Sequence, residues 1–365
     1  MSLSKIDLPS ISGLGYGFKN RIINGAMTFD QRNSGAAVTM SNAVVYNLDR
    51  WWSYEDTDGT MTAQQSSVAP TGFTKSLLCT TTVADASLSA TQRVVISQAI
   101  EGYNIADLGW GSAGAAAAVT LSFWVRSSLT GLFGGACKGG DNRSYPFSYT
   151  ISAANTWEYK TVTIAGDTTS TWNTTNGTGF NINFGLGVGT TNSGTAGAWV
   201  TGDYNSCTGA TSVIGTSGAT FYITGVQLEK GTVATSFDWR PYGTELNLCQ
   251  RYYYKSYSQS IVPGTASAQP TNSAWVVDIT SLNRIFYVAG AKFAVTMRAY
   301  PTTVTYYAED GTANSVSAYN NAALKLTISS TPSPTDNNLS GYLQLSSNAT
   351  AGMPYVFSFT ASAEL

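Results

Sequence analysis

The feature that most constrains this chain is an alternation of apolar and polar residues in short segments, each bounded by Gly, Asn, Asp or Ser. From Val119 to Arg126 the first of every two residues is apolar, and Ile182 to Val188 repeats the pattern. A period of two is typical of a β-strand with one face on a core. The opposite face of the second segment carries only Asn183, Gly185 and Gly187. We therefore expect a flat polar surface there that another sheet, chain or ligand can approach closely.

Two departures from plain alternation predict local structure. Between Phe221 and Leu228 the alternation changes phase at Gly225, which predicts a β-bulge at that glycine. Helical patterns are scarce, and short turns are expected only around 98–108 and 244–254.

The chain divides into three parts. Residues 1–19 mix Ser, Gly and Pro with isolated apolar residues, which predicts an attachment arm or linker. Strand patterns fill 20–248 and, after a change of composition, 249–365. We predict an all-β protein whose last part is a second small β-sandwich. Its strands are expected at 274–279, 285–293, 303–307, 324–328, 342–345 and 355–360, with a polar loop at 330–341.

Composition excludes several kinds of chemistry. The 365 residues include no His, so catalysis by Ser-His-Asp or Cys-His and a His-based zinc site are ruled out. The 19 Lys and Arg and 21 Asp and Glu give a net charge of −2 without a basic run, so nucleic acid is not an expected partner. The most apolar stretch, 115–125, is too short to span a membrane, and no secretory signal is visible.

The four cysteines, Cys79, Cys137, Cys207 and Cys249, form no CxxC pair. Neither a metal knuckle nor a thioredoxin-like motif is therefore predicted. We expect buried free thiols, and a bridge between 79 and 207 or between 137 and 207 stays an alternative.

Carboxylates are the remaining catalytic candidates, because a pair of them flanking a sugar bond is the minimal apparatus of a glycosidase. The acids in question are Asp49, Glu55, Asp56, Asp58, Glu101, Asp107, Glu229 and Asp238. Most lie beside basic or turn residues, which favours ion pairs and turns, so no catalytic residue is predicted. The run EDTDG at 55–59 has oxygen ligands but lacks EF-hand spacing. A structural calcium ion is left open, and no cofactor is predicted.

Aromatic residues are the strongest functional signal. Sugar rings present C–H faces that stack on flat aromatic rings, while nearby polar groups bind the hydroxyls. Trp172 lies in the polar run TTSTWNTTNGTG, which predicts a surface position, whereas Trp110 and Trp124 are assigned to packing. The candidate glycan- or receptor-binding residues are Trp172, Trp199, Tyr254, Tyr257 and Trp275. The alternative is that these rings anchor sandwich cores.

Six segments together resemble a widespread family of bacteriophage tail-fibre and related virion proteins. They are NRIINGAMTFDQRNSG (20–35), YNLDRWW (46–52), QAIEGYNIADLGWGSA (98–113), VTLSFWVRSSLTGLFGG (119–135), SYPFSYTISAANTWEYKTVTIAGDT (144–168) and FYITGVQLEKGTVATSFDWRPYGTELNLCQRYY (221–253). The resemblance spans 20–253 and names no catalytic residue.

The resemblance implies that 20–248 is a jelly-roll β-sandwich similar to carbohydrate-binding modules, carried on a trimeric virion appendage. It further implies that 1–19 is a virion-attachment arm that contacts a tail, baseplate or capsid protein. In that setting 249–365 is the expected receptor-binding tip, and the partner is a host-surface glycan. The leading hypothesis is a non-enzymatic phage fibre. Its rivals are an architectural fibre without receptor binding and a depolymerising tailspike.

Overall fold

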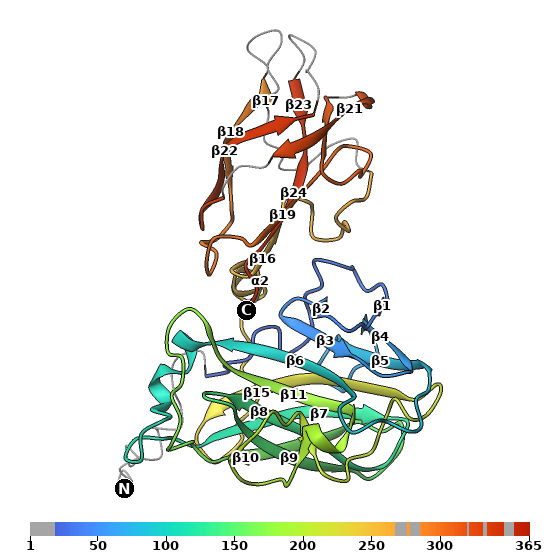
Figure 1. The fold of residues 1–365 in the computed structure, drawn as a ribbon, viewed down its shortest axis with the longest axis vertical. Coiled ribbons are helices and arrows are strands. Elements are labelled where there is room, and N and C mark those ends of the chain that lie inside the picture. Colours follow the sequence, from blue (N-terminus) through green and yellow to red (C-terminus); the bar gives the residue numbers. More distant parts are fainter. Residues whose placement is uncertain (1–18, 267–275, 278–284, 320, 331–333, 347–353) are drawn as a thin grey trace, which may run out of the picture.

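The computed structural model describes residues 19–266, 276–277, 285–319, 321–330, 334–346 and 354–365. Figure 1 shows two sets of sheets, one formed by the first part of the chain and one by the last. Within these ranges, no helix combines the length and the apolar character needed to cross a membrane. The predicted all-β class is confirmed.

Two antiparallel sheets form the first set. The strands of one are β1 (Val38–Thr39), β4 (Thr60–Ser66), β5 (Ser76–Val83), β7 (Val119–Ser127), β10 (Glu158–Ile164) and β15 (Thr220–Lys230), in the order β1-β4-β5-β15-β7-β10. The strands of the other are β2 (Val45–Leu48), β3 (Trp51–Glu55), β6 (Arg93–Glu101), β8 (Gly131–Gly139), β9 (Arg143–Ile151), β11 (Thr178–Val188) and β13 (Val200–Thr201), in the order β13-β9-β8-β11-β6-β3-β2. A small parallel pair, β12 (Ser193–Gly194) and β14 (Ser206–Cys207), lies apart from both.

One apolar core joins the two sheets into a jelly-roll sandwich. The alternate residues Val119, Leu121, Phe123 and Val125 of β7 are fully buried, as are Phe180, Ile182, Phe184 and Leu186 of β11. The period-two prediction is thus confirmed for β7 and for β11 up to Leu186, whereas Val188 at the end of β11 is only half-buried. At 25 cal/mol per Å² of apolar area, each such side chain contributes about 1.5–3 kcal/mol to folding.

The glycine face of β11 is covered by the chain itself. A Cβ on Gly185 would lie 2.8 Å from Cβ of Ser206, and one on Gly187 would lie 2.4 Å from Cγ2 of Ile214. The expected close approach therefore occurs, and residues of the same sandwich make it.

The bulge predicted in β15 is present. Its register against β7 shifts between Thr224 and Gln227, and Gly225 has a φ of 62°. Helical turns were expected in the segment 98–108. They are found only in the second half of that segment, as the 3-10 turns η1 (Gly102–Asn104) and η2 (Ala106–Leu108). Residues 98–101 belong to β6 because they pair with β11. A third 3-10 turn, η3, covers Thr190–Asn192.

The last part of the chain forms two further sheets. Their strands are β16 (Tyr253–Lys255), β17 (Val276–Val277), β18 (Ile285–Lys292), β19 (Thr303–Tyr307), β20 (Ser315–Ala318), β21 (Asn321–Ser330), β22 (Asn338–Leu345), β23 (Pro354–Val356) and β24 (Ser358–Ser362). The orders are β16-β24-β19 and β17-β23-β20-β21-β22-β18. Buried residues such as Tyr306, Phe357 and Phe359 join these sheets in one apolar cluster.

Sequence patterns missed some details of this part. Strand β20 was not expected, and the segment 355–360 is divided between β23 and β24 rather than forming one strand. The loop expected at 330–341 is wrong at both ends, because Ser330 belongs to β21 and β22 begins at Asn338. Most of the strand expected at 274–279 lies outside the described residues.

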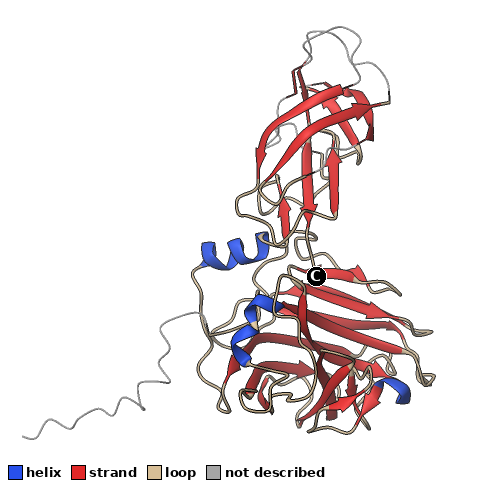
Figure 2. Ribbon diagram, turned by 60° about the vertical axis from the view of Figure 1, so that its left-hand side comes forward, coloured by secondary structure: helices blue, strands red, loops and turns tan. Residues whose placement is uncertain are grey.

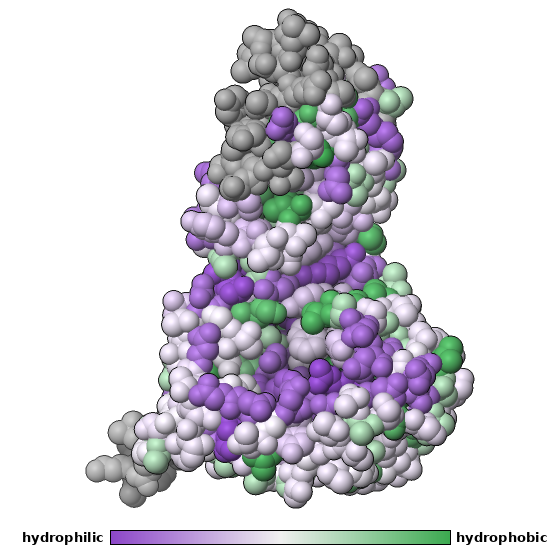
Figure 3. Space-filling model, viewed as in Figure 1, coloured by the Kyte–Doolittle hydropathy of each residue, from purple (hydrophilic) through white to green (hydrophobic). Residues whose placement is uncertain are grey.

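A helix connects the two sets of sheets. Helix α2 (Tyr242–Gln250) overlaps the helical segment expected at 244–254 but begins at Tyr242, and Tyr253 and Tyr254 belong to β16 instead. The helix stands between the two sets of sheets in Figure 2. Cys249 and Tyr252 pack with Ile23 and Phe29 in a small apolar cluster. We call the narrow region between the two sets of sheets the waist. Hydrophilic residues gather around it in Figure 3. The division at residue 248 itself stays a prediction.

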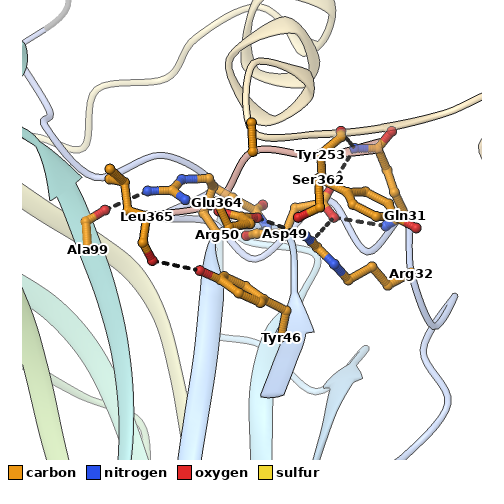
Figure 4. Close-up of polar contacts among 12 residues, drawn as sticks. Gln31, Arg32, Tyr46, Asp49, Arg50, Ala99, Tyr253, Ser362, Glu364 and Leu365 are labelled. Carbon is orange, nitrogen blue, oxygen red and sulfur yellow. Dashed lines mark hydrogen bonds and ion pairs between the residues drawn. The ribbon is translucent and has the colours of Figure 1, made fainter. Parts of the chain in front are cut away.

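Side chains from both ends of the chain meet at the waist (Figure 4). Glu364, just after β24, pairs with Arg32 at 2.8 Å and with Arg50. The guanidinium of Arg50 also lies over the ring of Tyr252, 3.6 Å from its centroid. Arg251 and the hydroxyl of Tyr252 both donate to Glu101 at 2.6 Å. These contacts tie the last part of the chain to the first sandwich.

The four cysteines are free and buried, as expected, so neither alternative disulfide forms. Burial raises the pKa of every one of these thiols.

Candidate functional site

A groove of about 640 Å³ crosses the face of β7 and β15 that points away from the core. The floor of the groove is formed by residues on the outer faces of β7, β10 and β15. The loop before β5 and the segment that follows β15 supply the other lining residues. The lining residues are Thr71, Gly72, Phe73, Ser122, Trp124, Tyr159, Gly225, Ala234, Thr235, Ser236, Phe237 and Trp239. We call this surface the aromatic groove.

Five aromatic rings give the groove its character. Trp124 and Tyr159 come from neighbouring strands and lie with ring centroids 5.4 Å apart. Phe73 packs against Trp239 at 4.9 Å, and Phe237 packs against the same indole at 4.8 Å. Tyr159 is 43% exposed and Trp239 is 57% exposed. Flat apolar rings are therefore available to a ligand on both sides of the groove.

The bulge in β15 makes this arrangement possible. A Cβ on Gly225 would lie 2.7 Å from the ring of Phe73 and 3.1 Å from that of Trp124. Gly225 also has the positive φ that glycine adopts without strain. The glycine thus leaves the space in which rings from the loop and from β7 meet.

Buried polar groups hold the segment after β15 in place. The amide of Gln227 accepts a hydrogen bond of 2.7 Å from the backbone N–H of Asp238. Glu229 accepts another, of 2.8 Å, from the N–H of Thr235. Because Gln227 and Glu229 are buried on β15, the wall that carries Phe237 and Trp239 is anchored to the sheet.

Among the described residues that line the groove, no side chain carries a charge. Hydroxyl groups of Thr71, Ser122, Tyr159, Thr235 and Ser236 are present in the lining. Such a surface suits a neutral ligand that has both apolar faces and hydroxyl groups.

Trp172 does not lie on the surface as its polar neighbours in sequence predicted. It is only 6% exposed and packs against Trp110 at 4.8 Å and Trp199 at 5.3 Å. Its indole N–H donates to Asp167 at 3.1 Å. Burial acts to raise the pKa of Asp167, but hydrogen bonds from Trp172 and Arg143 bring it below the ordinary value. Distant aromatic rings, absent from the local sequence, bury this tryptophan.

The other predicted binding residues are scattered. Trp199 is half-buried and donates to the carbonyl of Ala165 at 2.6 Å. Tyr254 and Tyr257 are buried in the last part of the chain. Trp275 lies outside the described residues. The structure thus brings together Trp172 and Trp199 and places neither in the aromatic groove.

Sequence reasoning missed the residues that form the groove. Trp124 was assigned to packing, although the alternation in β7 puts it on the face opposite the core. Phe237 and Trp239 are not among the binding residues that the sequence predicted. The available signal was the pair of aromatics in FDWRP directly after a strand, next to a bulge.

Several of the acidic candidates have structural partners. Asp49 pairs with Arg32 at 3.3 Å rather than with its sequence neighbour, and Glu229 binds the segment after β15. In the EDTDG run, Glu55 accepts from the N–H of Met61 at 2.9 Å and Asp56 from the N–H of Arg93 at 2.6 Å. Within the described ranges, no three side chains of the kinds that ligate metals come together.

Comparisons with known proteins give only distant likenesses. No family model matches the sequence, and no curated protein matches it. Among solved structures, the enzymatically active domain of tailspike protein 4 from bacteriophage CBA120 aligns with 58% of this chain at 14% identity and a TM-score of 0.31. This chain spans only 21% of that tailspike chain.

Carbohydrate-binding modules align over a similar region. The module TmCBM61, solved with β-1,4-galactotriose, covers 58% of this chain and 99% of its own length at 10% identity and a TM-score of 0.29. The family 11 module of Clostridium thermocellum, solved with a mixed-linked tetrasaccharide, covers 53% and 96% at 11% identity and a TM-score of 0.27. TM-scores this low carry no argument about function. The function of this chain is therefore inferred from the aromatic groove itself.

Proposed function

We propose that this chain is a non-enzymatic glycan-binding protein that holds its ligand in the aromatic groove. The observation that carries the proposal is the combination of Trp124, Tyr159 and Trp239 in one uncharged groove of about 640 Å³. That volume lies within the range of about 300–1,000 Å³ typical of ligand sites.

The physical basis of glycan binding is the stacking of sugar rings on aromatic side chains. The cost of removing water from the groove is small, because no charged side chain lines it. The C–H faces of a sugar ring displace water from exposed aromatic rings, and nearby hydroxyl and backbone groups pair with the sugar hydroxyls. No carboxylate lines the described groove, whereas hydrolysis of a glycoside uses two. Binding without cleavage is therefore the function that we propose.

We further propose that the protein is a phage virion fibre that displays this groove to host-surface glycans. The support is the resemblance of residues 20–253 to tail-fibre and related virion proteins. A homotrimer, attachment through residues 1–19 and receptor contact through 249–365 belong to the same proposal. Electron microscopy of intact particles with this chain labelled tests its location, and adsorption of phage in competition with the purified protein tests receptor binding.

The glycan proposal is tested by calorimetric titration with a panel of neutral oligosaccharides. Trp124→Ala should weaken binding of the ligand by about tenfold or more, equivalent to about 1.4 kcal/mol. Trp157→Ala is the matched control, because Trp157 packs on Tyr222 of β15 outside the groove. Equal losses in both variants, or no binding to any member of the panel, would exclude the groove as a glycan site. Release of new reducing ends during incubation would show an enzyme instead.

A purely architectural fibre is the second candidate. It is favoured by the burial of Trp172, Tyr254 and Tyr257, which makes these rings part of the cores. A purely architectural role predicts that neither the purified protein nor its Trp124→Ala variant competes with the adsorption of phage to host cells.

A further inference from the structure

A second, smaller pocket adjoins the aromatic groove across Phe237 and Trp239. It has a volume of about 230 Å³. Its lining residues are Asn20, Asn24, Gly25, Ala26, Thr28, Phe29, Thr74, Phe237, Asp238, Trp239, Arg240, Tyr242 and Glu245. We call it the acidic pocket. Phe237 and Trp239 line both cavities, so the acidic pocket and the aromatic groove are neighbours on the protein surface.

Aromatic rings at the mouth of the acidic pocket are open to solvent. Trp239 is 57% exposed and Tyr242 is 61% exposed. Tyr242 is supported from below by Phe29, whose ring centroid lies 4.7 Å away. The π-faces of such rings attract cations, and Trp and Tyr do so most strongly.

Two carboxylates and one guanidinium give the acidic pocket its charge. Arg240 is the sole cationic side chain among its described lining residues. Its side chain is 4% exposed, and the guanidinium contacts Glu245 at 3.0 Å and the carbonyl of Ile22 at 3.2 Å. Arg240 is thus held within the protein by acceptors of its own, and the pocket has a net charge of −1.

Asp238 retains acceptor capacity. Its Oδ2 accepts hydrogen bonds from the backbone N–H groups of Lys19 at 2.9 Å and Asn20 at 3.1 Å. Among the described residues, no donor is found for its Oδ1. Since a carboxylate oxygen can accept two hydrogen bonds, Asp238 can still bind a donor supplied by a ligand.

We infer that the acidic pocket binds an amino sugar with a free, protonated amino group, as one unit of the glycan that occupies the groove. This inference rests on the proposed function. The ammonium group would lie between the exposed rings of Trp239 and Tyr242 and donate to the carboxylate of Asp238, a charge-assisted contact. An acidic sugar is disfavoured there, because its carboxylate would face Asp238 and Glu245.

The test compares three probes of equal length by calorimetry at pH 6: glucosamine oligomers, their N-acetylated counterparts and cello-oligosaccharides. The glucosamine oligomer should bind about tenfold more tightly than the N-acetylated one, a difference of about 1.4 kcal/mol. Asp238→Asn should reduce that ratio to near one while leaving affinity for the cello-oligosaccharide unchanged. Asp58→Asn, which removes an exposed acid outside both cavities, is the matched control and should retain the ratio.

Tyr242→Ala provides a second variant whose folding is not at risk, because the ring is mostly exposed. It should lower affinity for the glucosamine oligomer by a larger factor than affinity for the cello-oligosaccharide, because only the ammonium group gains from the π-face of the tyrosine. Equal affinities of the wild type for the two amino-sugar probes, or a preference that survives in both variants, would overturn the inference. If neutral probes still bind in a Trp124-dependent manner, the proposed function stands without it. If no probe binds, both fail.

Discussion

The carboxylate of Glu364 lies 2.8 Å from the guanidinium of Arg32, although 332 residues separate the two along the chain. The same carboxylate pairs with Arg50, whose side chain is 1% exposed. One acid from the end of the last sheet thus compensates two cations of the first sandwich.

Glu364→Gln should lower the free energy of unfolding by about 3 kcal/mol, because it leaves the buried Arg50 without its partner. Urea denaturation followed by tryptophan fluorescence measures the loss. The matched control is Asp310→Asn, which breaks the half-exposed pair with Lys325 and should cost at most about 1 kcal/mol. Similar losses in the two variants would contradict a special role for Glu364.

Asp49 should make stability fall as pH rises from about 4 to about 6. Burial raises the pKa of its carboxyl from 3.8 to about 6, and the contact with Arg32 opposes this only in part. Over that interval the folded chain holds a proton that the unfolded chain has already released, so the proton stabilises the folded state and its loss weakens it. Urea denaturation across this pH range should show the fall in the wild type relative to Asp49→Asn. Parallel curves for the two proteins would refute the assignment.

Gly225→Ala should both destabilise the protein and damage the aromatic groove. The new Cβ would meet the rings of Phe73 and Trp124 on a backbone with φ of 62°, and positive-φ strain alone costs about 1 kcal/mol or more. Gly114→Ala is the control, since nothing lies within 4 Å of its Cβ position. Thermal unfolding should separate the two variants, and oligosaccharide affinity should fall only in Gly225→Ala.

The four thiols should be unreactive in the folded protein. All are buried, and burial raises the pKa of each, so the nucleophilic thiolate is scarce. A thiol reagent that reports by absorbance should modify none at pH 8 in buffer and all four in concentrated urea. Rapid modification of any cysteine under native conditions would show local opening of its core.

Sequence patterns predicted strands well where the apolar residues of a strand all lie on the face that packs on the core. The alternation in β7 and β11 identified their core faces, and the change of phase at Gly225 identified the bulge. These are local properties, because side-chain direction repeats every two residues whatever the strand packs against.

The binding surface was much harder to predict, because its residues are distant in sequence. Phe73, Trp124, Tyr159 and Trp239 meet only after the sheet has formed and the segment after β15 has folded back on it. Trp172 shows the converse: its polar neighbours indicated exposure, yet Trp110 and Trp199 bury it. Local composition describes a residue's neighbours along the chain and not its neighbours in space.

The position of Glu364 has a consequence for modular evolution and for engineering. Strand β24 ends at Ser362, and two residues later the chain reaches the socket formed by Arg32 and Arg50. A recombination event that replaced everything beyond α2 would therefore also replace the acid that fills this socket. Chimeras should tolerate a foreign segment after α2 only when the donor supplies an acid at the equivalent place. Compatibility between the two parts is thus set by three charged residues, of which Arg32 and Glu364 lie 332 residues apart in the sequence.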